Sequence, residues 1–167
     1  FDKTGTLTKG QPAVVDSMIV TGDEREILTL AASVQNGSEH PLAKAFVDLA
    51  DTRGVDMGNV SDFKSFTGEG VSGRFDGRSV LLGNRNFLEK NNVATMSWLE
   101  KAEPWEKEAR TVVWMALDGI LVALFALADP IRKEAKSAVE ALRRLGIDSH
   151  VLSGDAPAVV DAVASAV

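Results

Sequence analysis

The residues best suited to chemistry lie at the start of the chain, in the run Asp2–Thr8 (DKTGTLT). An Asp that follows an apolar residue and precedes small hydroxyl residues and Gly is suited to act as a nucleophile at the end of a strand. Thr4 and Thr6 would offer hydroxyl and backbone groups to phosphate oxygens, and Gly5 would allow close approach. The run therefore predicts phosphoryl transfer to the carboxylate of Asp2.

The residue two positions after the nucleophile separates two kinds of chemistry. In phosphatases that use an aspartate nucleophile, this position usually holds a second Asp, which acts as a general acid and then activates the hydrolytic water. Here the position is Thr4. Without an acid–base group there, an aspartyl phosphate on Asp2 would persist long enough to drive another process. A stand-alone phosphatase is the alternative, which an absence of turnover of aryl phosphates would exclude.

Five shorter motifs follow in chain order. They are Ser38–Leu42 (SEHPL), Thr67–Val71 (TGEGV), Leu82–Asn84 (LGN), Asp129–Arg132 (DPIR) and Ser153–Asp155 (SGD). His40 would stand at a helix start, where unpaired backbone N–H groups favour an anionic ligand. Each motif alone also fits a structural role, because glycine pairs mark turns, Asn84 can cap a helix and Asp129 can cap another.

The run Asp2–Thr8 resembles the phosphorylation motif of the P-type ion-pumping ATPases at every position. SEHPL is similar to a signature of the heavy-metal subclass, and the other motifs occur in that family's order over essentially the whole chain. The resemblance implies a nucleotide-binding domain at residues 13–127. This domain would be inserted into a phosphorylation domain of the haloacid-dehalogenase type at residues 1–12 and 128–167. The implied cofactors are ATP and Mg²⁺.

The same resemblance implies roles for individual residues. Mg²⁺ would be held by the Asp2 carboxylate and the Thr4 carbonyl, and His40 would contact the nucleotide. The residues implied at the ATP site are Gln35, Glu39, His40, Pro41, Gly68, Gly70, Val71, Gly83, Asn84 and Asp129. Those implied in catalysis are Asp2, Lys3, Thr4, Thr6, Ser153, Gly154 and Asp155. Gln35 replaces a Glu that reaches the adenine in this subclass, which predicts weaker or less selective adenine recognition.

The resemblance also implies a longer protein, with transmembrane and actuator domains as partners and this chain at the cytoplasmic face of a membrane. The family's second catalytic segment, with a Lys and a Gly-Asp-Gly-x-Asn-Asp motif, is not in this sequence. We therefore expect the chain to bind nucleotide as a monomer without turnover. Copper is the expected cargo because it is the most frequent one in the subclass. A non-catalytic ATP-binding or docking module is a further alternative.

Composition limits the other classes of function. Among 167 residues, 18 are basic, 24 are acidic and none is Cys. The lack of Cys excludes disulfides, a thiolate metal site and a cysteine nucleophile. The net charge of -6 argues against nucleic acid as a partner. The longest apolar run, Ile120–Ala128, is shorter than the ~18–20 residues that span a bilayer, so we expect a soluble chain.

The elements that must position these residues follow from local patterns. Asp23 is expected to cap one helix, and a second helix is expected from Pro41 to Gly54. The pairs Asp76–Gly77 and Asp118–Gly119, each between strand-like flanks, predict two hairpins and hence an antiparallel sheet covered by helices.

The C-terminal part shows a different order. Asp129 and Pro130 are expected to start a helix that Gly146 ends, and its apolar face is expected to hold Ala135, Ala138, Leu142 and Leu145. A strand at Ser149–Leu152 and another helix should follow. This alternation is typical of a parallel α/β fold. The predicted class is therefore α/β, with an antiparallel α+β domain inserted into a partial parallel α/β domain.

Overall fold

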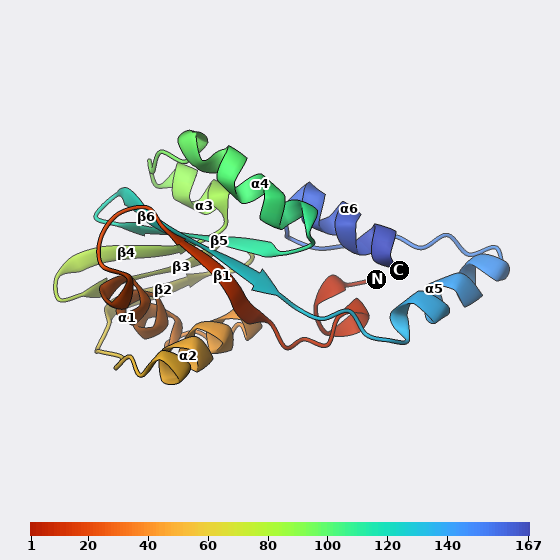
Figure 1. Ribbon diagram of the computed structural model, residues 1–167, viewed down its shortest axis with the longest axis horizontal. Helices are drawn as coiled ribbons and strands as arrows, with labels where there is room; N and C mark the ends of the chain where they lie inside the picture. Colours follow the sequence, from red (N-terminus) through yellow and green to blue (C-terminus); the bar gives the residue numbers. More distant parts are fainter.

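An antiparallel sheet forms the middle of the chain in the computed structural model, which describes residues 1–167 (Figure 1). Its six strands have the order β1-β6-β5-β4-β3-β2. They are β1 Ala13–Ile19, β2 Ser61–Phe66, β3 Gly70–Phe75, β4 Arg78–Gly83, β5 Thr111–Leu117 and β6 Ile120–Ala128. The predicted α/β class, with an antiparallel sheet flanked by helices, is confirmed.

The chain also contains six α-helices. They are α1 Glu24–Gln35, α2 Pro41–Arg53, α3 Arg85–Lys90, α4 Leu99–Lys107, α5 Ala135–Arg144 and α6 Pro157–Ala166. As predicted, the Asp23 side chain caps α1 by accepting from the Glu26 amide, and α2 ends at Gly54 with a φ of 60°. None of these helices has the length and apolar character needed to cross a membrane.

Both predicted hairpins form. β3 and β4 join at Asp76–Gly77, and β5 and β6 join at Asp118–Gly119. In each pair both residues have positive φ, with 51° at Asp118 and 80° at Gly119. This is the backbone that two-residue hairpin turns require, because it follows the twist of the flanking strands.

We expect Gly119→Ala to lower the free energy of unfolding by about 1–2 kcal/mol, because a Cβ is strained at positive φ. The strain would be the only cost, since no atom lies within 4 Å of a Cβ built there. Gly119→Asn should lose less, because Asn tolerates this conformation. Urea denaturation compares the two variants. Equal midpoints for the Ala variant and the wild type would contradict the strained turn.

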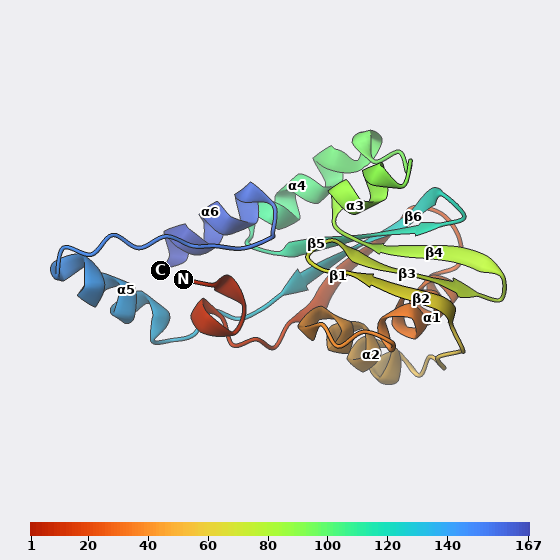
Figure 2. The same cartoon turned by 180° about the vertical axis from the view of Figure 1, so that it is seen from behind.

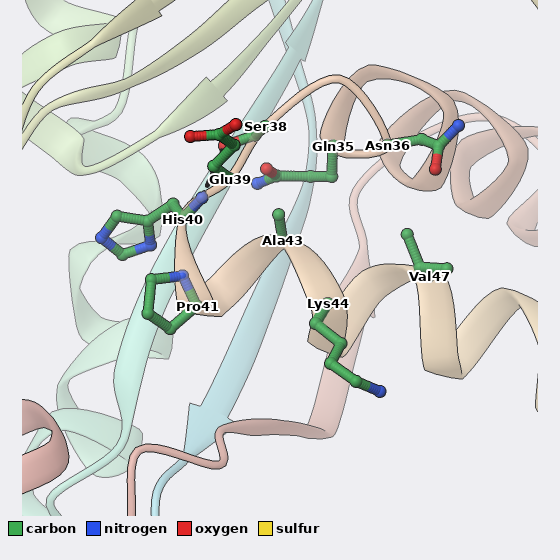
Figure 3. Close-up of a pocket in the computed structure, with 9 residues that line it drawn as sticks. All are labelled: Gln35, Asn36, Ser38, Glu39, His40, Pro41, Ala43, Lys44 and Val47. Carbon is green, nitrogen blue, oxygen red and sulfur yellow. Dashed lines mark hydrogen bonds between the residues drawn. The ribbon is translucent and has the colours of Figure 1, made fainter.

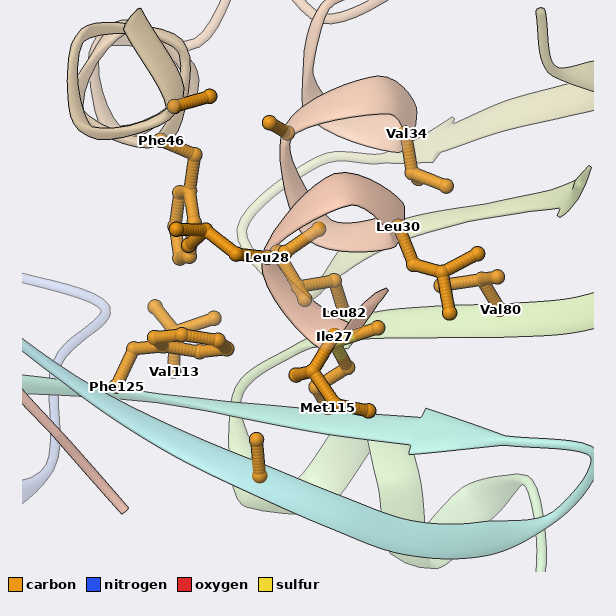
Figure 4. Packing of buried hydrophobic residues seen from close by; sticks show 14 of the residues in the cluster. Ile27, Leu28, Leu30, Val34, Phe46, Val80, Leu82, Val113, Met115 and Phe125 are labelled. Carbon is orange, nitrogen blue, oxygen red and sulfur yellow. The ribbon is translucent and has the colours of Figure 1, made fainter. Parts of the chain in front are cut away.

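Two hydrophobic layers hold the helices against opposite faces of the sheet. On β5, Val113 and Met115 pack with α1 and α2, whereas Val112 and Trp114 pack with α3 and α4. This division follows from the two-residue period of a strand. Figure 4 shows the first layer, in which the rings of Phe46 from α2 and Phe125 from β6 meet edge to face at 5.0 Å.

A third, smaller core joins the two ends of the chain. It contains Leu7, Ala135, Val139 and Val163, which come from the N-terminal segment, α5 and α6. The apolar face predicted for α5 is only partly confirmed, because Ala138 and Leu145 are exposed. Nothing in the chain packs over that side of α5, which extends away from the sheet (Figures 1 and 2).

The strand predicted at Ser149–Leu152 does not form. Only Leu152 makes a bridge, which is parallel and has Asp2 as its partner. Val151 packs against the core around Leu7 and Val163, but the segment has a single backbone pairing and no ladder. The Leu152 amide donates to the Phe1 carbonyl at 2.8 Å, and this bond holds the two segments together.

Candidate functional site

The parallel bridge between Asp2 and Leu152 places the predicted nucleophile beside the predicted Ser-Gly-Asp turn. Because the two segments run in the same direction at this bridge, the residues after Asp2 and after Leu152 lie close together. Asp2 itself is exposed and takes no part in the hydrogen bonds around Asp155. Its carboxylate is therefore accessible to a ligand from solvent.

The residue after Asp2 forms a buried ion pair. The Lys3 ammonium is 2.6 Å from the Asp155 carboxylate, and the two side chains are only 7% and 11% exposed. Two hydroxyls complete the shell of the carboxylate: Thr111 donates to Oδ1 at 2.6 Å, and Ser153 donates to Oδ2. A buried pair needs such further hydrogen bonds to offset the loss of hydration of both charges.

The surroundings of Asp155 act on its pKa in opposite directions. Burial raises the pKa of the Asp155 carboxyl, but the charge of Lys3 and hydrogen bonds from Lys3, Ser153 and Thr111 outweigh it. The resulting pKa lies below the usual 3.8. Asp155 is therefore ionised at neutral pH, as a partner of Lys3 must be.

Asp129 does not cap a helix, which corrects the sequence prediction. Its carboxylate accepts from the Thr8 hydroxyl at 2.6 Å and from the amides of Gly10 and Gln11. Helix α5 starts six residues later, at Ala135, without a side-chain cap. The backbone after Asp129 is extended because it pairs with the N-terminal segment, so the predicted cap has no helix end to bind.

Arg132 ties the same two segments together. Its guanidinium donates to the carbonyls of Thr8 at 2.9 Å and Gly5 at 3.0 Å, and its amide donates to the Leu7 carbonyl. The chain thus leaves for the sheet and returns from it through one hydrogen-bonded pair of segments. Both covalent links between the sheet and the Asp2 region therefore run through this pair of segments.

A pocket of about 330 Å³ lies where α1 ends and α2 begins (Figure 3). Four predicted nucleotide-site residues line it, namely Gln35, Glu39, His40 and Pro41. Gln35 is only 6% exposed, and Figure 3 shows its amide directed towards the loop that carries Glu39. The sequence missed Lys44 and Val47, which also line the pocket and which helical spacing from His40 would have indicated.

His40 caps helix α2 with its own ring. Its Nδ1 accepts from the Leu42 amide at 3.2 Å. Partial loss of hydration lowers the pKa of His40 from the usual 6.5, and the Asp155 carboxylate acts in the opposite direction. The lowered pKa makes the ring neutral at pH 7. Because Nδ1 accepts a hydrogen bond, the proton of the neutral ring lies on Nε2. This leaves one N–H donor and the ring face for a ligand.

The other predicted nucleotide residues form a second cluster. Asn84 caps α3 by accepting from the Phe87 amide at 2.8 Å, as predicted, and its side-chain amide also donates to the Gly68 carbonyl at 3.0 Å. Gly68, Gly70, Val71, Gly83 and Asn84 do not line the pocket. Figure 2 shows the β2–β3 turn at the same end of the sheet as the start of α2. The glycine and Asn84 cluster and the His40 pocket therefore lie at the same end of the sheet, but the cluster does not line the pocket.

Gly70 and Gly83 face each other on paired strands, and this closeness was not predicted. A Cβ on Gly70 would lie 2.4 Å from the Leu82 carbonyl oxygen and 2.7 Å from the Gly83 Cα. The ring of Phe87 lies 2.8 Å from the same point. Gly70 is therefore required by packing as well as being a candidate ligand contact.

The donor set around Asp2 fits Mg²⁺. The chain has no group of three or more acidic or histidine side chains that could hold a metal by themselves. Asp2 and the Thr4 carbonyl would supply oxygen ligands only. Mg²⁺ is commonly held by one or two carboxylates, with water and substrate phosphates completing its octahedron.

The whole chain, residues 1–167, matches the profile of the haloacid dehalogenase-like hydrolases. The chain belongs to this family.

Within the haloacid dehalogenase-like hydrolases, the similar proteins are heavy-metal P-type ATPases, which confirms the resemblance found in the sequence. A copper-exporting P-type ATPase of Legionella pneumophila is 39% identical over 98% of this chain. A silver-exporting P-type ATPase of Salmonella typhimurium is 37% identical over 98% of the chain. The chain spans about a fifth of the length of these relatives (22% and 20%).

A solved structure of the catalytic domain of the CPx-ATPase CopB-B, described for its changes on nucleotide binding, has the same fold. It superposes with a TM-score of 0.77 and is 30% identical. The match covers 99% of this chain and 56% of that one. The order of helices and strands in this haloacid dehalogenase-like hydrolase is therefore that of a P-type ATPase catalytic domain.

Proposed function

We propose that this chain binds ATP and carries the phosphoryl acceptor of a heavy-metal P-type ATPase. Residues 13–127 would form the nucleotide-binding domain, and residues 1–12 and 128–167 would form part of the phosphorylation domain. The observation that carries the proposal is the single parallel bridge between Asp2 and Leu152, which joins the nucleophile to the Ser153–Asp155 turn. The pocket at His40 lies at the end of the sheet that is nearest the N-terminal segment (Figure 2).

In the proposed reaction, an Asp2 carboxylate oxygen attacks the γ-phosphorus of ATP. The bond from that phosphorus to the bridging oxygen breaks, and ADP leaves with the electron pair. Water later attacks the phosphorus of the aspartyl phosphate and loses a proton to solvent. The bond from phosphorus to the Asp2 oxygen breaks, which releases inorganic phosphate and restores the Asp2 carboxylate. Mg²⁺, held by the Asp2 carboxylate and the Thr4 carbonyl, would neutralise the charge on the phosphoryl oxygens.

Side chains of this chain would orient the two groups that react. The hydroxyls of Thr6 and Ser153 would donate to phosphoryl oxygens, while the buried Lys3–Asp155 pair links the segment after Asp2 to the Ser153–Asp155 turn. Nε2 of His40 would donate to the nucleotide, and Gln35 would accept from the adenine amino group. Thr4 replaces the acid–base residue of a phosphatase, which supports an aspartyl phosphate that lasts.

In the longer protein, phosphorylation and hydrolysis would drive a soft metal ion across a membrane, with this chain at the cytoplasmic face. The transmembrane and actuator domains would be its partners. Copper is the proposed cargo, because the similar copper-exporting pump of Legionella pneumophila matches nearly the whole chain. The residues that would bind the cargo lie outside this sequence.

Calorimetric titration with ATP, ADP and AMP-PNP tests the pocket. We expect His40→Asn to weaken binding at least tenfold, which corresponds to about 1.4 kcal/mol. Asn is chosen because it caps a helix as well as the wild-type ring does, so α2 should remain intact. His150→Asn is the matched control, since this exposed histidine lies outside the pocket. Equal affinities of wild type and His40→Asn would contradict the proposed contact, and no binding by folded wild type would contradict the ATP site.

A further inference from the structure

The hydroxyl of Thr111 joins two parts of the chain that the sequence separates widely. Thr111 is the first residue of β5, a central strand of the sheet. Its Oγ1 donates to Asp155 Oδ1 at 2.6 Å and accepts from Lys3 Nζ at 3.2 Å. A single hydroxyl can make both bonds, because it has one donor and two acceptor sites.

These two hydrogen bonds are polar contacts between the sheet and the buried ion pair. The other donors to Asp155 are Lys3, which follows Asp2, and Ser153, which lies in the same turn as Asp155. Both of these come from the segments around the nucleophile. Thr111 alone among the three is fixed by the sheet ladder, where it pairs with Leu127 of β6.

The ion pair needs this third partner. Lys3 and Asp155 are almost fully buried, so an oxygen of Asp155 without a donor would carry an uncompensated cost. The sheet can therefore turn away from the Asp2 region only if Asp155 loses the Thr111 bond. The orientation of the two parts is coupled to the hydrogen bonding of one carboxylate.

We infer that Thr111 is a positioning residue that fixes the sheet, with its nucleotide pocket, relative to the loop that carries Asp2. Its consequence for phosphoryl transfer rests on the proposed function, because the γ-phosphate of a nucleotide at His40 must reach Asp2. This role could not be predicted from the sequence, since Thr111 lies outside every motif. A Thr at the start of a strand is ordinary.

The test measures amide hydrogen exchange in the 167-residue chain with Thr111→Val, which keeps the branched shape and removes the hydroxyl. We expect exchange of the Leu152 amide to accelerate about tenfold, the factor for losing one hydrogen bond to a charged group. The Trp114 amide, in the centre of β5, should keep its rate. Thr111→Ser should restore the slow exchange, and Thr52→Val, which removes an exposed hydroxyl from α2, should change neither amide.

Residual dipolar couplings supply a second readout, because they report the orientation of the sheet relative to residues 129–167. Thr111→Val should alter the relative orientation or order of the two parts, whereas Thr111→Ser should not. Unchanged Leu152 exchange in Thr111→Val would overturn the inference, and so would equal acceleration of Leu152 and Trp114. Nucleotide titration of the same wild-type sample keeps the two proposals separate, since failure to bind ATP would refute the ATP site without affecting the exchange result.

Discussion

Lys3→Met should lower the free energy of unfolding by about 3–5 kcal/mol, because it leaves the Asp155 carboxylate buried without its counter-charge. Thr111 and Ser153 would still donate, but neither hydroxyl neutralises the charge. Urea denaturation at pH 7 measures the change. The matched control is Lys44→Met, which breaks a pair with Asp48 whose side chains are 77% and 55% exposed. That pair should contribute only about 0.3–0.5 kcal/mol.

The pH dependence identifies Asp155 as the source of this loss. Because the folded-state pKa of Asp155 lies below its unfolded value of 3.8, the pair stabilises the fold fully above that value. The contribution is lost as the pH falls through the lower folded-state pKa. The difference between wild type and Lys3→Met should therefore shrink in acid. A difference that stays constant down to the acid limit would show that the loss has another cause.

Removing both charges of the pair should restore stability that the single variant Lys3→Met loses. Lys3→Met combined with Asp155→Leu removes both buried charges, so most of the stability lost in the single variant should return. Additive losses in the double variant would contradict an ion pair. The proposed nucleophile Asp2 is unchanged in all of these variants, so the stability measurements do not depend on phosphoryl chemistry.

Gly70→Ala should lower the free energy of unfolding by about 1–3 kcal/mol, because a Cβ there meets the backbone of the next strand. The nearest atom, the Leu82 carbonyl oxygen, lies 2.4 Å away and cannot move without breaking the pairing of β3 with β4. Thermal or urea denaturation measures the loss. Gly154→Ala is the control, since nothing lies within 4 Å of a Cβ at that position.

Phe87→Leu separates the two causes of this strain. The Phe87 ring also lies 2.8 Å from the added Cβ, but the backbone contacts are closer. The Leu replacement should therefore not rescue Gly70→Ala. Full rescue would show that the aromatic ring alone requires Gly70. Equal stability of Gly70→Ala and the wild type would contradict the packing requirement for this glycine.

Features that depend on neighbours in sequence were predictable. The Asp-Gly turns, the Asp23 cap and the start of α2 at Pro41 each depend on the conformational preferences of one or two residues. The motif at Asp2–Thr8 was also readable, because a run of chemically restricted residues needs no tertiary information. These features placed the hairpins, the two N-terminal helices and the candidate nucleophile.

Edge strands were not predictable by the same means. β2, with the sequence SDFKSF, has little apolar alternation and is exposed at five of its six positions. Its extended form comes from pairing with β3. The strand predicted at Ser149–Leu152 does not form for the opposite reason. Its sequence suits a strand, but the segment has only one bridge, from Leu152 to Asp2. A strand forms only when it is hydrogen-bonded to another segment. The residues of the strand itself do not specify whether such a segment lies beside it.

Local sequence patterns identify the residues that can do chemistry and most of the helices and turns that present them. The contacts of Asp129 depend instead on the folded structure, because its donors lie 118 to 121 residues away along the chain. The same is true of the bonds between Thr111 and the Lys3–Asp155 pair. A hydroxyl or a carboxylate can bond to many partners. Which partner it meets depends on the packing of distant segments, and no local preference specifies that.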